Sequence, residues 1–527
     1  MAVLSRRVHA TRGAGLARAV VAALALAIGA AAASGSAAPS RNDFENYVVR
    51  AMPQQEIEDL RLPAPELPDL SAFTEQAVMA KLKTAPRGRA GLRRLVDMIQ
   101  FKEFAGSDGR LAEWARRQPT QPRAIYIEDG TVTPADLARQ IDRQWFEETE
   151  PGVFVLRLPL IVAQGATLHI DSRTRDFRMS EERGAFLVND GRLFITGSRL
   201  TAWREKDDAP ARFRGERDFR PFLLSWGGTE TYIVGSTVES LGYAAGKSYG
   251  VTISQYTPGT VRQMKRASPR AWILDSEFVD NWYGFYCYEA DDLVLVRNVY
   301  RDNITYAIDP HDRSNRLIIA ENDIYGTHKK HGLIISREVN NSWIFRNRAH
   351  HNGLSGIVID RNCAHNVVAD NTVFGNRADG ITVYESSDNL LWNNHAVGNE
   401  RHGIRVRNSQ RLRLYNNHAI ANGSSGIYGH IKDLSGTDRN LRMDPFSAEV
   451  SMIVFGGQLI YNESGPIAID QPLSLELYDV GMLAPSRSSG LQMSGVIGKN
   501  QHTVLDILMR QKLPVVIEPA QGAGRGV

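Results

Sequence analysis

The sequence predicts an all-β fold, a right-handed parallel β-helix with an N-terminal helical cap, and three observations support this prediction. Between Gly284 and Gly426 the chain repeats every 23 to 25 residues, and a glycine or alanine opens each unit. The residues that follow alternate between apolar and variable, which is the pattern of a half-buried strand. Two asparagine columns recur in the same register. A fixed period in the low twenties with short β segments is typical of a solenoid.

The asparagines distinguish this repeat from a leucine-rich one, which has a similar period but needs a leucine framework. The first column contains Asn298, Asn322, Asn347, Asn371, Asn394 and Asn417. The second contains Asn303, Asn352, Asn376, Asn399 and Asn422. Asparagine tolerates the left-handed backbone of a corner, and its amide can bond the same amide one coil away. We therefore expect both columns to be structural.

Residues 1–33 have the features of a cleavable secretory signal peptide. Basic residues up to Arg18 precede an apolar run from Val20 to Ala32. No later stretch reaches about 18 apolar residues, so we expect no stable membrane insertion. Removal of the segment takes away four arginines and no acid, which leaves 58 basic and 59 acidic residues and changes the net charge from +3 to −1. This balance argues against nucleic acid as a partner, and any polyanion would need a local basic patch.

Residues 34–150 are predicted to form an extended and helical capping region, because the open ends of a β-helix must be covered. Residues 34–70 are polar and rich in proline, so an extended lead-in is expected. A helical face is predicted from the spacing of Leu92, Leu95, Val96 and Ile99. Thr133 is a good N-cap before Pro134. The helix that it opens is expected to run through Leu137, Ile141 and Trp145.

Residues 151–515 are assigned to the β-helix, with β structure beginning around Val153. The charged stretch Trp203–Arg220 breaks the repeat and is a candidate lid or long loop. The coils become irregular after Gly426, and residues 516–527 are expected to form a loose tail.

The two cysteines, Cys287 and Cys363, are not expected to form a disulfide, although export would permit one. They lie three coils apart in the repeat, which corresponds to about 14 Å at the spacing of neighbouring strands. A disulfide needs a Cα separation of about 4.4–6.8 Å. We therefore expect two free thiols, at least one of them in the core, and no metal site through them.

The repeat assigns side chains to one outer face, because the residues two and four places after the opening glycine point outward from the strand. The first outward column reads Tyr286, Asp309, Ile334, Val358, Thr382 and Arg405. The second reads Tyr288, His311, Ser336, Asp360, Tyr384 and Arg407. The strand exits read Glu289, Asp312, Arg337, Arg361, Glu385 and Asn408. A long outer face with tyrosine, acid, histidine and arginine on adjoining coils suits a linear saccharide polymer.

One coil departs from the repeat, at the tetrapeptide Asp309-Pro310-His311-Asp312. Pro310 occupies an inward strand position and has no N–H for the ladder, so the strand must deform there. The same coil has Thr327 where the others have the second asparagine, and it ends with Lys329-Lys330-His331. Departures from the local rules that concentrate in one coil are typical of a functional site.

The chemistry of this coil points to proton transfer beside a carboxylate. His311 can exchange protons near neutral pH, and Arg337, one coil beyond Asp312, could hold a carboxylate through two parallel hydrogen bonds. No metal or cofactor is expected, because no coil gathers a tight set of histidine, cysteine and carboxylate ligands. A glycosidase fits poorly, because it needs two carboxylates across the scissile bond, whereas Asp309 and Asp312 lie on one strand.

Three segments, residues 222–232, 283–292 and 306–314, together with their order, resemble the periplasmic mannuronan C5-epimerases of alginate-producing bacteria. The resemblance runs from about residue 120 to beyond residue 480. It implies a right-handed β-helix, a periplasmic location, no metal requirement, and conversion of β-D-mannuronate to α-L-guluronate within the polymer. It implies a linear polyuronate (polymannuronate or alginate) as the partner and leaves open a place in a periplasmic alginate secretion complex. The nonapeptide repeats of the extracellular calcium-dependent epimerases do not occur in the sequence.

The resemblance also implies residue roles. His311 would remove the C5 proton, positioned by Asp309 or Asp312, and Arg337 would neutralise the substrate carboxylate. Reprotonation from the opposite face stays open between water and a tyrosine such as Tyr286 or Tyr306. Further substrate contacts are expected from Tyr286, Tyr288, Tyr306, Lys329, Lys330, Arg361, Arg405 and Arg407. Two alternatives stay open: a β-elimination polysaccharide lyase on the same fold, and a non-catalytic polysaccharide-binding secretion scaffold.

Overall fold

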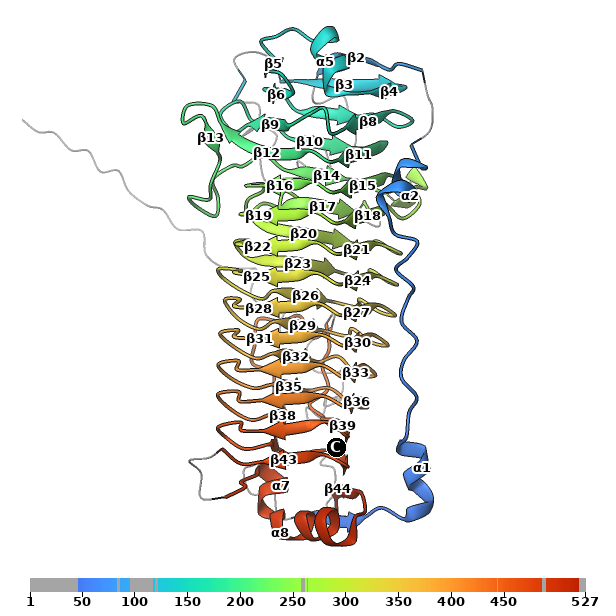
Figure 1. Cartoon of the computed structure of the whole chain (residues 1–527), viewed down its shortest axis with the longest axis vertical. Coiled ribbons are helices and arrows are strands. Elements are labelled where there is room, and N and C mark those ends of the chain that lie inside the picture. The colour runs from blue at the N-terminus through green and yellow to red at the C-terminus, as the bar shows by residue number, and fades with distance from the viewer. Residues whose placement is uncertain are drawn as a thin grey trace, which may run out of the picture.

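Three β-sheets, in which almost all neighbouring strands are parallel, run side by side along the long axis of the molecule (Figure 1). Each coil of the chain gives one strand to each sheet, so the parallel β-helix predicted from the repeat is confirmed. The computed structural model describes residues 46–82, 86–94, 117–118, 122–256, 261–262, 264–442, 444–485 and 490–520. The predicted signal peptide, residues 1–33, lies outside the described residues.

We name two of the sheets by what lies on their outer faces. The groove sheet contains β2 (Arg89–Arg94), β3 (Arg123–Asp129), β7 (Leu160–Val162), β10 (Leu187–Asn189), β14 (Leu223–Ser225), β17 (Gly250–Ser254), β20 (Tyr283–Tyr288), β23 (Tyr306–His311), β26 (Leu333–Ser336), β29 (Ile357–Asp360), β32 (Ile381–Tyr384), β35 (Ile404–Arg407), β38 (Ile427–His430) and β41 (Ile467–Ile469). The strap sheet contains β1 (Tyr47–Ala51), β44 (Val515–Pro519), β42 (Ser474–Tyr478), β39 (Ser451–Phe455), β36 (Leu412–Tyr415), β33 (Leu390–Trp392), β30 (Val367–Ala369), β27 (Trp343–Phe345), β24 (Ile318–Ala320), β21 (Val294–Val296), β18 (Arg270–Leu274), β15 (Glu230–Val234), β11 (Arg192–Thr196), β8 (Thr167–Ile170) and β4 (Thr131–Val132). The third sheet contains β43 (Gly481–Leu483), β40 (Gln458–Ile460), β37 (His418–Ile420), β34 (His395–Val397), β31 (Thr372–Phe374), β28 (Arg348–His350), β25 (Asp323–Tyr325), β22 (Val299–Arg301), β19 (Glu277–Val279), β16 (Thr237–Glu239), β12 (Arg199–Arg204), β9 (Asp176–Ser180), β6 (Val153–Leu156) and β5 (Phe146–Glu150), with β13 (Ala209–Pro210) paired to β12.

The register of the groove sheet agrees with the columns predicted from the repeat. Tyr286 pairs with Asp309, and Tyr288 pairs with His311. His311 in turn pairs with Ser336 on the next coil. The alternate residues of these strands point inward and join one continuous apolar core that runs through the solenoid. The outward columns therefore form a single face, on which each coil follows the last at about 4.8 Å.

Pro310 interrupts the ladder as its missing N–H requires. Strands β23 and β26 are paired at Ile308 with Leu333 and at His311 with Ser336 only. The following strands, β26 and β29, pair at four successive positions. The deformation places the interruption directly beside His311.

The asparagine columns form hydrogen-bonded ladders inside the corners, as predicted. Asn371 accepts from the backbone N–H of Asn347 at 2.9 Å and from its side-chain amide at 3.0 Å. It donates its own amide to the Ile344 carbonyl at 2.8 Å and to Asn394 at 2.9 Å. Each ladder asparagine thus ties its coil to both neighbours.

The ladder asparagines do not, however, supply the left-handed backbone that we expected of them. A positive φ belongs to the residue immediately before each one, namely Arg297, Glu321, Arg346, Asp370, Asn393 and Asn416. The amide must point into the coil to reach its neighbours, so the preceding residue makes the turn.

Replacement of Asn371 by alanine is expected to lower the free energy of unfolding by roughly 1–3 kcal/mol, because buried donors and acceptors on both neighbouring coils lose their partner. The measurement is chemical denaturation of the variant beside wild type. Gln458→Ala, which removes an exposed amide from the third sheet, is the control and should change stability little. Equal stability of Asn371→Ala and wild type would contradict the role of the ladder.

The N-terminal capping region differs from the helical prediction. Leu92 lies in β2, which pairs antiparallel with β3, and the other three residues of the predicted helical face lie outside the described residues. Strand β3 pairs parallel with β7, so the groove sheet begins before residue 151. Alternate residues of β3 face opposite sides, as in a strand: Ile125 and Ile127 join the main core, and Ala124 and Tyr126 join a second cluster. At Leu92 the helical prediction is wrong, because four apolar positions are too few to separate the two periods.

The predicted helix at Thr133 is present but short. α5 (Pro134–Gln140) begins with a capping box in which Thr133 and Asp136 bond each other's backbone N–H groups. The helix ends at Gln140 because Ile141 takes an extended conformation, so Trp145 lies beyond it. Leu137 is fully buried at this end of the core, where α5 covers the coils.

The N-terminal segment also reaches the opposite end of the solenoid. β1 pairs antiparallel with β44, which pairs antiparallel with β42. From there the chain passes through η2 (Gln54–Glu56) and α1 (Ile57–Leu60). It then runs along the strap sheet to α2 (Glu75–Met79) (Figure 1). We call residues 46–82 the strap.

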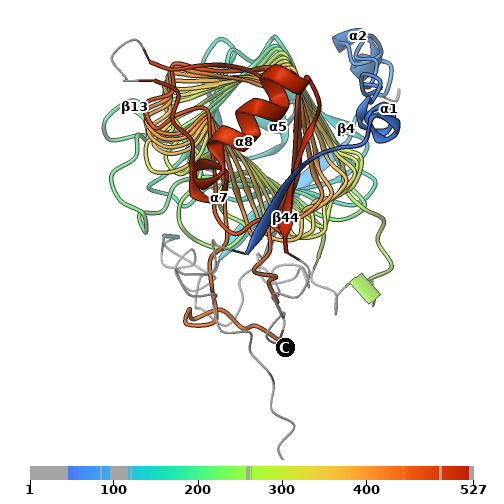
Figure 2. The same ribbon diagram turned by 90° about the horizontal axis from the view of Figure 1, so that it is seen from below.

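The C-terminal end is closed by ordered structure rather than by a loose tail. Val516 to Pro519 belong to β44, and Ile517 is fully buried, so this part of the prediction for residues 516–527 is wrong. Pairing with β1 supplies the partner that makes an apolar strand stable there. α7 (Gly495–Lys499), α8 (Gln501–Leu505) and η4 (Asp506–Gln511) complete the cap, and Figure 2 shows α7 and α8 lying across the end. Residues 521–527 lie outside the described residues.

Two further expectations concern cysteines and the charged stretch. Cys287 and Cys363 are both free and buried, as predicted.

Within the Trp203–Arg220 stretch, Arg220 is buried and binds the Asp280 carboxylate at 3.0 Å, so the end of this stretch is anchored in the core. No helix in the described ranges is long and apolar enough to cross a membrane.

Candidate active site on the groove sheet

The tetrapeptide coil brings a histidine, an aspartate and an arginine into contact. The Nδ1 atom of His311 bonds the carboxylate of the adjacent Asp312, which leaves Nε2 as the ring nitrogen for proton transfer. The other oxygen of Asp312 lies 3.8 Å from Nη1 of Arg337, on the next coil. This distance is too long for a hydrogen bond, and the Arg337 side chain is about half exposed. The arrangement offers an imidazole nitrogen beside a guanidinium that lines the groove.

Asp312 is held ionised by its neighbours. Burial raises the pKa of its carboxyl. The hydrogen bond to His311 and the charges of His311, Arg337 and Arg313 together lower the pKa by more, so that it lies below its ordinary value. An ionised Asp312 fixes the imidazole with its proton on Nδ1. That tautomer presents the lone pair of Nε2 to a substrate.

Asp309, two residues earlier, lies in a different environment. Its side chain is buried, and its Oδ1 atom has no hydrogen-bond partner. Burial raises the pKa of this carboxyl to about 7; the charges of His311 and Lys330 oppose the rise, and those of Asp312 and Asp360 add to it by less. The pKa values of Asp309, within β23, and of Asp312, just after β23, are thus shifted in opposite directions, which is typical of sites that move protons.

Asp309 is expected to make stability depend on pH. The pKa of Asp309 is raised from 3.8 to about 7 in the folded protein. The stability that the protonated carboxyl contributes to the folded state is therefore fully present below pH 4 and is lost as the pH rises to about 7. Asp309→Asn should therefore be increasingly more stable than wild type as pH rises through this window, by up to about 4 kcal/mol. Melting temperatures of both proteins from pH 4 to pH 9 test this. A difference that does not change with pH would contradict the burial effect.

The tyrosines gather on the side of His311 that faces the preceding coils. The ring centroids of Tyr286 and His311 are 6.0 Å apart, and those of Tyr283 and Tyr306 are 5.1 Å apart. Burial raises the pKa of Tyr286 and Tyr306 above the ordinary range, and the Asp309 carboxyl adds to the effect. Both phenols are therefore protonated near neutral pH and can act as hydrogen-bond donors or acids.

The predicted lysines occupy different positions. Lys329 pairs with Glu216 and lies over the rings of Phe213 and Trp282 at 5.1 and 5.2 Å. It therefore attaches the loop after β13 to the corner of the tetrapeptide coil. Lys330 lies 5.3 Å over the ring of Tyr306, on the tyrosine side of the site.

The predicted arginines lie farther along the groove sheet. A cleft of about 700 Å³ extends from Asp312 and Arg337 past Arg361 to Arg407. Arg405 is outside this cleft, where its Nε donates to His430 at 3.1 Å. The structure thus brings Arg361 and Arg407 into one cavity with the tetrapeptide and sets Arg405 apart.

The sequence reasoning missed three residues of this surface. Tyr283 precedes its glycine by one place, as Tyr306 precedes Ala307, so reading that column would have found it. Lys247 places its Nζ atom 3.6 Å over the ring of Tyr288, but it lies in a loop with no repeat. Arg439 lines the cleft from the loop of residues 431–450, which has no repeat either.

Tyr288 lies beside the site rather than within its centre. It is the register partner of His311, and its hydroxyl is 3.5 Å from Nη2 of Arg313. Burial, with Glu289 adding to it, raises the pKa of Tyr288 to about 12.

Within the described residues, no three histidine, cysteine or acidic side chains come close enough together to hold a metal ion.

Comparison with known proteins agrees with the fold and places the chain among characterised sequences. A family model described as a right handed beta helix region matches residues 283–430. A mannuronan C5-epimerase of Pseudomonas putida is 53% identical over 477 residues, covering 90% of this chain and 91% of its own. The mannuronan C5-epimerase AlgG of Azotobacter vinelandii is 55% identical over 463 residues, covering 88% of each chain. A crystal structure of the periplasmic alginate epimerase AlgG superimposes with a TM-score of 0.79 at 52% identity, covering 80% of this chain and 100% of that one.

Fold and site together define a right-handed parallel β-helix protein with a histidine–aspartate pair and an arginine on its groove sheet. The identities above extend over most of the chain and of each relative. The chain belongs to the mannuronan C5-epimerases, and it is therefore an epimerase, that is, an isomerase.

Proposed function

We propose that the protein converts β-D-mannuronate to α-L-guluronate at C5 within a polymannuronate chain, with His311 as the base. The observation that carries this proposal is the bond from His311 Nδ1 to Asp312, with Arg337 one coil away. A ring nitrogen that can accept a proton and a guanidinium on the next coil are the two groups that the proposed reaction uses.

The reaction begins with the C5 proton, which is a weak acid because the carbanion formed beside a carboxylate carries a second negative charge. Arg337 pairs with the substrate carboxylate as that charge develops, a contribution of about 3–4 kcal/mol for a single good donor. His311 Nε2 takes the proton. A proton returned to C5 from the opposite face completes the inversion, and no bond of the chain is broken.

The tyrosines and the second aspartate support this assignment. Tyr286 and Tyr306 are protonated phenols beside His311, so either one or a water molecule can return the proton. Asp309 is buried on the outer face of the same strand, beneath the tyrosines, and its carboxyl can influence the base through its charge. The site residues Tyr288 and Lys330 border the same surface and can bind neighbouring sugar units.

A periplasmic location is part of the proposal. It rests on the signal-like residues 1–33 and on the similarity to a periplasmic alginate epimerase. An alginate secretion complex is the setting in which such an enzyme would meet its polymer.

The direct test is proton NMR of polymannuronate after incubation with the purified protein. Guluronate signals support the proposal. Unsaturated chain ends would mean a lyase, which shares the proton abstraction but expels the 4-O-linked sugar. An unchanged polymer would mean a binding protein.

Removal of metal ions is expected to leave the reaction rate unchanged, because charge neutralisation is assigned to the guanidinium of Arg337 and not to a metal ion. The measurement is the rate on polymannuronate after EDTA treatment and desalting, beside untreated protein. A rate that falls with EDTA and returns with calcium would contradict this assignment.

A further inference from the structure

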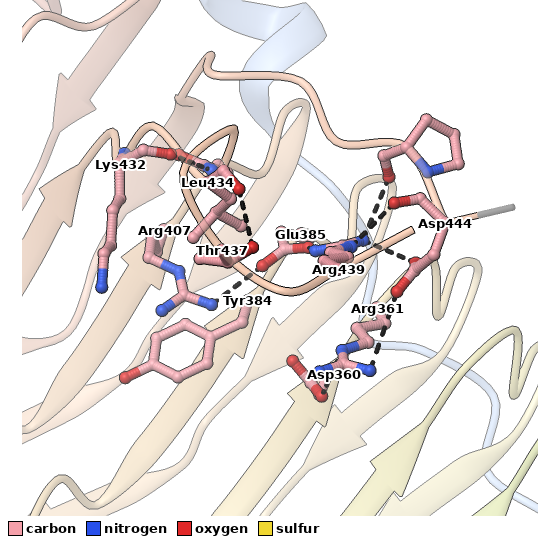
Figure 3. Close-up of polar contacts among 12 residues, drawn as sticks. Asp360, Arg361, Tyr384, Glu385, Arg407, Lys432, Leu434, Thr437, Arg439 and Asp444 are labelled. Carbon is pink, nitrogen blue, oxygen red and sulfur yellow. Dashed lines mark hydrogen bonds and ion pairs between the residues drawn. The ribbon is translucent and has the colours of Figure 1, made fainter. Parts of the chain in front are cut away.

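The cleft beyond the tetrapeptide contains arginines that are paired with carboxylates of the protein itself (Figure 3). Arg407 Nη2 donates to one oxygen of Glu385 at 2.9 Å, and Arg439 pairs with the other oxygen. A second nitrogen of Arg439 donates to Asp444 at 2.5 Å. The other oxygen of Asp444 lies 3.7 Å from Nη1 of Arg361. Two carboxylates thus stand between three guanidinium groups.

These groups come from two separate parts of the chain. Arg361, Glu385 and Arg407 follow or end successive strands of the groove sheet, whereas Arg439 and Asp444 belong to the loop of residues 431–450. The loop crosses the strand ends in Figure 3, so that Arg439 lies beside Glu385. The Glu385 side chain is only 3% exposed and that of Arg439 only 10%. The loop is therefore attached to the groove by nearly buried ion pairs.

The geometry at Glu385 is that of a carboxylate bound by two arginines, which is also how a protein recognises an anionic ligand. Such pairs are strong when shielded from water, but each charge has lost hydration to form them. A ligand that supplied its own carboxylates could take over the guanidinium groups at little net cost. A polyuronate carries one carboxylate on every sugar.

We propose that Arg439 is a specificity-determining residue for long polymers, and that Glu385 and Asp444 occupy the places of substrate carboxylates while the groove is empty. This inference rests on the proposed function. The register puts Glu385 three coils beyond Asp312, which is about 14 Å. Only a chain of several sugar units can reach both His311 and Arg439.

The first experiment measures kcat/KM of Arg439→Ala on polymannuronate and on the shortest oligomannuronate that wild type converts. A lost charge-assisted bond of about 1.5–3 kcal/mol corresponds to a roughly tenfold to hundredfold fall. This fall is expected on the polymer and not on the short oligomer. Arg411→Ala is the matched control, because Arg411 pairs with Asp388 at an exposed corner outside the cleft. Equal behaviour of the two variants would overturn the inference.

The second experiment uses Glu385→Gln, which keeps the shape of the side chain and removes its charge. If Glu385 occupies the place of a substrate carboxylate, KM on the polymer should fall several-fold, because Arg407 and Arg439 become available. If Glu385 is only an anchor of the loop, KM should rise. This variant decides the question even if Arg439→Ala does not fold.

The two proposals fail in different ways. Wild-type protein that leaves polymannuronate unchanged removes the proposed function. Wild-type protein that forms guluronate, with polymer kinetics insensitive to Arg439 and a KM raised by Glu385→Gln, removes this inference alone.

Discussion

His311→Ala should lower the rate of guluronate formation by at least a hundredfold, with the fold intact. Loss of a general base costs typically 10²–10⁴-fold. The side chain points outward from β23 and is partly exposed, so its removal leaves no cavity in the core. The measurements are the epimerisation rate by NMR and the melting temperature of the same preparation.

His418→Ala is the control for this experiment, because His418 lies on the outer side of the third sheet and stacks on His395. It should retain full activity. His311→Ala with more than a few per cent of the wild-type rate would exclude His311 as the base. Loss of the fold in that variant would leave Asp312→Asn, which should release the imidazole from its fixed tautomer and lower kcat, as the deciding measurement.

Arg337→Ala should lower kcat by about a hundredfold or more, the usual effect of losing one donor to a developing negative charge. Arg337→Lys should restore only part of the loss, because lysine keeps the charge but not the planar pair of donors. Both constants must be measured on polymannuronate, since the distinction lies between kcat and KM.

The alternative is that Arg337 only helps to hold the polymer, as Arg361 and Arg407 are expected to do. Many sugar units would then share the binding, and the loss of one arginine would raise KM modestly and leave kcat near its wild-type value. That result would contradict carboxylate neutralisation by Arg337. Arg361→Ala, measured in parallel, shows how large a pure binding effect is in this groove.

The coils and their outer face could be predicted because a repeat makes position along the chain equivalent to position in space. Once glycine fixes the start of each coil, period-2 alternation decides which side chains point outward. The pairing of Tyr288 with His311 and of His311 with Ser336 follows from that register alone. Pro310 then identifies the coil that departs from the repeat, where the active site was predicted.

The parts that could not be predicted are those without a repeat. The loop of residues 431–450 carries Arg439 to the groove through tertiary contacts that leave no period in the sequence. The sequence predicted Lys329 as a substrate contact and gave no sign of its partner, Glu216, which lies more than a hundred positions earlier. Contacts of this kind depend on where a loop returns to the solenoid, and local composition does not encode that return.

The strap has a consequence for how the molecule is assembled. A solenoid can begin to fold at any coil and extend by adding neighbours, but Arg50 of β1 bonds Glu518 of β44, 468 positions later. Strand β1 can therefore pair only after β44 has been synthesised, because β44 is the strand that it joins. Contacts of such sequence separation form slowly. The pairing of β1 is thus possible only after almost the whole chain has been synthesised, and a chain cut short before β44 would keep its first strand unpaired.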